Sequence, residues 1–124
     1  MDSTLDLLQR AAIRLSQSGS VKDRLADAYA SHLDEVDADE LPDGVRNEFA
    51  ALCAAMHRER PLPRESVIRA SVRKMSNDEA VHYAALVVRM FATLARTEVS
   101  GTATRRSARS KSAMPIVQLF AAEG

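Results

Sequence analysis

The chain has 124 residues, and its 17 lysines and arginines balance 17 aspartates and glutamates. This length suits one compact domain with a real core, and the absence of net charge leaves no overall field that would draw the molecule to nucleic acid or to an anionic membrane. With no tryptophan, four glycines and four prolines, the composition favours helices over strands.

The compartment can be argued from the cysteine content and from the N-terminal sequence. The single cysteine, Cys53, cannot form an internal disulfide, which is typical of a reducing environment. The opening residues, MDSTLDLLQR, lack the basic start and the continuous apolar run of a signal peptide. The most apolar stretch, YAALVVRMFATLA, is interrupted by Arg89 and is too short to cross a bilayer. We therefore expect a soluble cytoplasmic protein.

Two helices are predicted at the start of the chain. The first covers about residues 4–17, has Ser3 as a cap, and ends before Gly19, which favours the left-handed conformation of a helix terminus. Ser20 caps the second helix, and Asp23 faces its N-terminal dipole. The apolar face of the second helix comprises Val21, Leu25, Ala28, Tyr29, Leu33 and Val36.

The third and fourth helices follow the acidic stretch DADELPDG. The third begins near Asp43, and its apolar face comprises Val45, Phe49, Leu52, Cys53 and Met56. The stretch RERPLP ends it, because Pro61 and Pro63 each remove a backbone donor. Pro63 suits the first turn of the fourth helix. The apolar face of this helix comprises Val67, Ile68, Val72 and Met75.

The fifth helix has the clearest local start, because Ser76 and Glu79 have the spacing of a capping box. It is predicted to run to about Thr97. Its polar positions, Asp78, His82, Arg89 and Arg96, fall in one narrow band; we interpret the band as a solvated face, with an interface as the alternative. Since the rest of the helix is apolar, neighbours should surround it. The sequence therefore predicts an all-α protein, a small bundle of about five helices over residues 1–97 with the fifth helix central.

The composition changes after this helix. Residues 98–113 are rich in serine, threonine and arginine without periodic apolar positions, which predicts a basic linker. Residues 114–124 are an apolar segment, in which we expect Pro115 to start a short helix. We expect Ile116, Val117, Leu119 and Phe120 to share one face of that helix.

Metal sites receive little support from the residue spacing. A calcium loop that begins at Asp39 has Leu41 where the third-position ligand belongs, and Ala50 where the loop needs a glutamate. Cys53 and His57 lie four residues apart on one helix, and His32 could join them. A zinc site needs about three or four ligands, and nothing nearby in the sequence supplies the others. We predict neither a metal nor another cofactor.

The sequence also carries no catalytic or DNA-reading signature. The four glycines are isolated, so there is no phosphate-binding loop, and no nucleophile has a recognisable base. The fourth and fifth helices have the gross shape of a helix-turn-helix, but Asp78 and Glu79 would meet DNA phosphates with the wrong sign. Since no catalytic signature is present, we predict that the protein is not an enzyme; DNA binding by the fourth and fifth helices is not expected either.

The C-terminal segment is the best candidate for a functional site. Its apolar face could pack on the chain itself or on a second copy, or dock in a groove of another protein. Arg105, Arg106, Arg109 and Lys111 would then guide the encounter with an acidic surface. We predict a protein–protein interaction or regulatory accessory protein anchored by the four apolar residues named above. The alternative is a nucleic-acid-associated accessory factor that uses the basic run 105–111.

Overall fold

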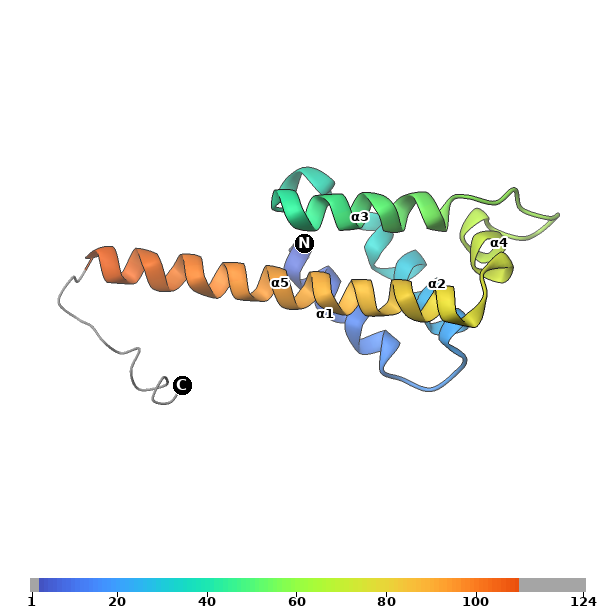
Figure 1. Cartoon of the computed structure of the whole chain (residues 1–124), viewed down its shortest axis with the longest axis horizontal. Helices are drawn as coiled ribbons and strands as arrows, with labels where there is room; N and C mark the ends of the chain where they lie inside the picture. The colour runs from blue at the N-terminus through green and yellow to red at the C-terminus, as the bar shows by residue number, and fades with distance from the viewer. Residues whose placement is uncertain (1–2, 110–124) are drawn as a thin grey trace. The chain divides into compact units, whose positions relative to one another are not determined.

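The computed structural model describes residues 3–109 and is all-α, with no strand in that range (Figure 1). The chain divides into two compact units, Met1–Leu94 and Ala95–Gly124. Its helices are α1 (Thr4–Leu15), α2 (Val21–Ser31), α3 (Asp43–Met56), α4 (Val67–Lys74) and α5 (Asn77–Arg109). Two short 3₁₀ turns, η1 (Leu33–Glu35) and η2 (Ala38–Glu40), connect α2 to α3.

Serine caps determine where four of these helices begin. The hydroxyls of Ser3, Ser20, Ser66 and Ser76 each accept a hydrogen bond from the backbone amide three residues ahead, at 3.0–3.1 Å. Each bond satisfies an amide that has no partner inside the helix. The predicted capping box of α5 is only half formed, because the Glu79 carboxylate pairs with Arg58 at 3.0 Å instead of reaching back to the cap.

The start of the fourth helix differs from the expectation. Pro63 is not in its first turn; it lies in a tight turn closed by a hydrogen bond from the Glu65 amide to the Leu62 carbonyl at 3.0 Å. The left-handed backbone of Arg64, with φ 67°, prevents this turn from continuing as a helix. Ser66 therefore becomes the cap, and α4 begins at Val67.

The core of the first unit joins α1, α2, α3, α4 and the first part of α5. Leu25 and Tyr29 of α2 are among its most deeply buried side chains, and Leu52 and Met56 of α3 pack in the same cluster. The observed α2 is shorter than the predicted second helix, because it ends at Ser31, whereas the predicted apolar face extends to Val36. Leu33 is nevertheless fully buried, because the following 3₁₀ turn carries it into the core.

The fifth helix is not surrounded on all sides within the first unit. Val87, Met90 and Leu94 are buried, whereas Val81 and Val88 on another face are 52% and 46% exposed. The expectation that neighbours surround the apolar part of this helix is therefore wrong at Val81 and Val88, because the neighbouring helices leave this part of its apolar surface open.

The fifth helix is also longer than the sequence indicates. Its backbone continues to Arg109, whereas the composition predicts an end near Thr97 and a linker over 98–113. One physical reason is that residues 98–109 contain two alanines and three arginines, which favour helices, and only one breaker, Gly101, which costs about 1 kcal/mol relative to alanine. Residues 110–113 and the predicted C-terminal helix at 114–124 lie outside the described residues. The proposed division into bundle, linker and apolar segment stays a prediction.

Candidate functional site

The predicted partner-binding residues fall at the end of the described chain or beyond it. Arg105, Arg106 and Arg109 belong to the α5 backbone, and the description does not extend to their side chains. Lys111, Ile116, Val117, Leu119 and Phe120 lie outside the described residues. The two hollows described below are both lined by residues of the first unit.

One of these hollows is an apolar groove where α1, α2 and α5 meet, with a volume of about 340 Å³. Val81 and Val88 stand one after the other along α5, with Ala84 and Ala85 between them. This spacing of three and four residues places all four on neighbouring turns of one helix face. We call this surface the α1/α5 groove. Its lining is Ala12, Leu15, Ser16, Val21, Arg24, Val81, Ala84, Ala85 and Val88.

The groove contains one ionisable lining residue, Arg24, and its guanidinium is already engaged. Nε donates to the Gly19 carbonyl at 3.0 Å, and a terminal nitrogen donates to the Leu15 carbonyl. These bonds satisfy carbonyls at and after the C-terminal end of α1 that have no helical partner. The aliphatic part of Arg24 remains available to the groove, so its lining is chemically suited to aliphatic side chains.

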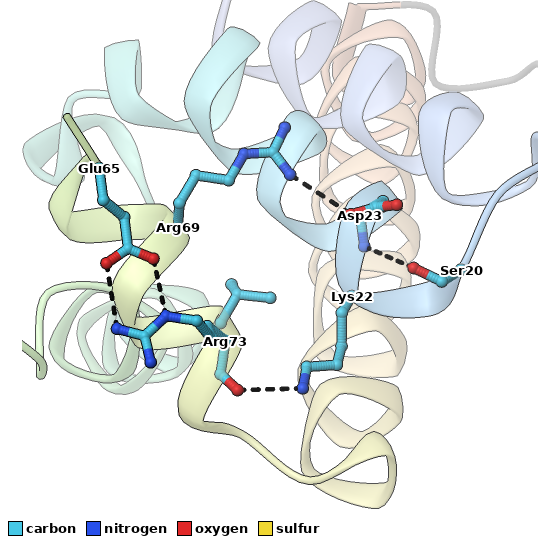
Figure 2. Close-up of a pocket in the computed structure, with 7 residues that line it drawn as sticks. Ser20, Lys22, Asp23, Glu65, Arg69 and Arg73 are labelled. Carbon is cyan, nitrogen blue, oxygen red and sulfur yellow. Dashed lines mark hydrogen bonds and ion pairs between the residues drawn. The ribbon is translucent and has the colours of Figure 1, made fainter. Parts of the chain in front are cut away.

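A second hollow, of about 400 Å³, is a polar cleft between the beginning of α2 and α4 (Figure 2). Arg73 holds both carboxylate oxygens of Glu65, at 2.8 and 3.0 Å. Arg69 reaches Asp23 at 3.5 Å and Asp27 at 2.7 Å. Lys22 Nζ donates to the Arg73 carbonyl at 3.1 Å and so satisfies the C-terminal end of α4.

Charge pairing shifts the titration of these groups. Hydrogen bonds from Arg73, followed by one from the Leu62 amide, lower the pKa of Glu65 to about 2. A hydrogen bond from Arg14, aided by the charges of Arg69 and of Arg14 itself, lowers the pKa of Asp27. The carboxylates and guanidiniums of the cleft neutralise one another, so little charge is left over to attract a ligand. We interpret the cleft as a contact that holds α2 and α4 together.

The histidine and cysteine candidates are brought together only in part. Cys53 and His57 lie beside Tyr29, whose hydroxyl donates to the Cys53 sulfur at 3.4 Å. His57 Nδ1 lies 3.0 Å from the Cys53 carbonyl, and its ring packs edge-on against Tyr29 with centroids 5.7 Å apart. Burial, followed by the hydrogen bond with Cys53, raises the pKa of Tyr29.

His32 does not complete a metal-binding cluster with these residues. Over the part of the chain that the structure describes, no three histidine, cysteine, aspartate or glutamate side chains are grouped as metal ligands would be. Over the same part, none of the helices combines the length and the apolar character that crossing a membrane requires.

Sequence reasoning missed the α1/α5 groove, although a signal for it was present. The fifth helix is apolar over more of its circumference than one core contact can cover, and Val81 and Val88 belong to that surplus. Comparison with known proteins found no matching family model, no matching curated protein and no matching solved structure. The function therefore has to be argued from the chemistry of the chain itself.

Proposed function

We propose that this chain is a small protein–protein interaction protein of a regulatory, non-enzymatic kind, and that residues 114–122 of one copy dock in the α1/α5 groove of a second copy. The observation that carries the proposal is the open, mostly aliphatic lining of the groove. Val81 and Val88 are exposed about two turns apart on one face of α5, and the guanidinium of Arg24 is engaged by backbone carbonyls. The anchors are Ile116, Val117, Leu119 and Phe120.

The energetics favour a weak and reversible contact. Burial of each of these four side chains contributes about 1.5–3 kcal/mol. Ordering of the segment costs about 1–2 kcal/mol per residue, which offsets most of that gain. A contact of this strength forms and dissociates readily, which suits a protein whose association is regulated by its concentration.

The basic run supports the same interaction by steering the encounter. Arg105, Arg106, Arg109 and Lys111 precede the anchors in the sequence. The first unit carries an acidic stretch over residues 34–43 in which the carboxylate side chains are exposed. Attraction between these opposite charges would raise the rate of association more than the final affinity.

Light scattering after size-exclusion chromatography, over a concentration series, tests this proposal. The wild-type mass should rise toward a dimer with concentration, and the double variant Leu119→Asp, Phe120→Asp should remain monomeric. Val88→Glu should also abolish association, because it places a charge in the groove. The matched control is Ile13→Glu, because Ile13 is 50% exposed and does not line the groove.

Two outcomes would contradict the proposed docking. One is a wild-type mass that stays monomeric at every concentration. The other is a dimer that survives both the C-terminal substitutions and Val88→Glu.

The nucleic-acid alternative has one observation in its favour, since Arg105, Arg106 and Arg109 lie within about one turn of helix α5. Its signature is different. Binding to a fluorescent oligonucleotide would weaken steeply between low and moderate salt, because phosphate contacts release counterions. Apolar docking should change little over that range.

A further inference from the structure

The connection between α3 and α4 presents an unusual apolar side chain to solvent. Leu62 is 56% exposed, more than any other large apolar side chain that the structure describes. Pro61 and Pro63 flank it, and Arg60 and Arg64 stand outside them. In Figure 1 the connection projects past the end of α3. We call residues 60–65 the RPLPRE turn.

The conformation of this turn is fixed from within. The Glu65 amide donates to the Leu62 carbonyl, and the Leu62 amide donates to Glu65 Oε1, each at 3.0 Å. Arg73, on α4, in turn donates hydrogen bonds from Nε and from a terminal nitrogen to the two oxygens of the Glu65 carboxylate (Figure 2). Pro63 adds a restricted φ at the centre of the turn. Because these constraints exist before any partner arrives, binding would lose little conformational freedom.

Arg64 occupies a backbone conformation that favours glycine. Its φ is 67°, and among the described residues it is the only one other than glycine with a positive φ. Within that same part of the chain neither Arg64 nor Arg60 forms an ion pair, and both are exposed. Arg64 therefore has an unfavourable backbone conformation, and its side chain forms no ion pair that would stabilise the described part of the chain.

We propose that the RPLPRE turn is a preformed recognition element that inserts Leu62 into an apolar pocket on a partner protein. Carboxylates at the rim of that pocket pair with Arg60 and Arg64. This interaction is separate from the α1/α5 groove and from the C-terminal segment.

The chemistry of the turn favours a protein partner over the other classes. Phosphate binding would use the two arginines and leave Leu62 without a role, and the turn has no aromatic side chain to stack on a base. A membrane surface would receive only one sizeable apolar side chain, which is too little for stable anchoring. A pocket with an acidic rim uses Leu62 and both arginines at once.

Site-specific photo-crosslinking tests the proposal in cells that express the full chain. A benzoylphenylalanine replaces Leu62, and the matched control carries it at Ile13, which is 50% exposed on α1. We expect the probe at position 62 to crosslink a protein that the probe at position 13 does not. The attachment site in that protein should have aspartate or glutamate nearby. No crosslinked protein specific to position 62, or an attachment site without nearby carboxylates, overturns the proposal.

A second measurement asks whether Arg64 acts in binding or in folding. In the chain that carries benzoylphenylalanine at position 62, Arg64→Gly should reduce the yield of the crosslinked protein at least fivefold. The thermal unfolding midpoint should stay equal to that of wild type or rise. An unchanged yield, or a lowered midpoint, overturns the assignment of Arg64 to recognition. The variant Leu119→Asp, Phe120→Asp should leave the yield from position 62 unaltered, so failure of the C-terminal proposal is distinguishable from failure of this one.

Discussion

At the scale of single residues, Ser71 shows how a polar side chain is accommodated in the core. It lies on α4 and is fully buried. Its hydroxyl oxygen accepts a hydrogen bond from the Glu59 amide at 3.0 Å. That amide lies just after α3, so one serine links the end of one helix to the middle of another. The bond matters because it is partly buried, and an amide that is shielded from water without a partner is costly.

Ser71→Ala should therefore lower the free energy of unfolding by about 1–3 kcal/mol, the cost of leaving the Glu59 amide unsatisfied. Urea denaturation monitored by circular dichroism measures it. Ser31→Ala, at an exposed serine, is the control and should change stability by less than about 0.5 kcal/mol. Equal effects of the two substitutions would mean that the Glu59 amide finds another partner.

The residue scale is also where the sequence is most informative. Leu25, Tyr29, Phe49 and Leu52 are predicted to be buried from helical spacing, and they are. This works because a helix presents one stripe to its neighbours, and apolar side chains gain by occupying it. The hydrogen bond between Tyr29 and Cys53 could not be predicted, since it depends on how α2 and α3 cross.

At the scale of elements, α4 is short and depends on its ends. It has eight residues, too few for a stable isolated helix in water. Ser66 caps its start, Lys22 satisfies the Arg73 carbonyl at its end, and Glu65 holds the Arg73 side chain. The sequence predicted α4 itself and placed its start at Pro63. Two local signals compete there, Pro63 as a first-turn residue and Ser66 as a cap. The left-handed backbone of Arg64 decides in favour of Ser66, and nothing in the sequence indicates that conformation.

The Glu65–Arg73 pair makes part of the stability pH-dependent. The pKa of Glu65 falls from an ordinary value of 4.5 to about 2 in the folded chain. A lowered folded pKa means that the contribution is present above pH 4.5 and is lost as pH falls toward 2. Glu65→Gln removes this contribution. The stability difference between wild type and Glu65→Gln should therefore be larger at pH 5.5 than at pH 2.5, as measured by urea denaturation at both pH values.

A suitable control for this pH experiment is Glu35→Gln, because the Glu35 side chain is exposed and lies far along the chain in η1. Its difference from wild type should be nearly the same at both pH values. A pH-independent difference for Glu65→Gln as well would show that the pair with Arg73 does not form in solution.

At the scale of the whole molecule, the extent of α5 was the part that composition could not predict. Composition changes near Thr97, but the helical backbone continues to Arg109. Weak helix formers such as serine and threonine permit both linker and helix, so composition alone does not decide between them. The sequence indicates that α5 has more apolar surface than one core contact can cover, but it does not indicate which side its neighbours leave open.

The last prediction concerns how little of the chain the first unit needs for folding. This unit ends at Leu94, and Val87, Met90 and Leu94 are its last buried side chains on α5 within the described residues. A chain that ends at Glu98 should unfold with a free energy within about 0.5 kcal/mol of the full chain, at concentrations where both are monomeric. A chain that ends at Leu86 should not fold, because it loses three core side chains worth about 1.5–3 kcal/mol each, a sum comparable with the whole stability of a small domain. Urea denaturation and amide hydrogen exchange measure both. A loss of several kcal/mol in the longer chain would contradict the prediction, since residues beyond 98 would then have to pack on the core, and the C-terminal segment would serve folding before it served a partner.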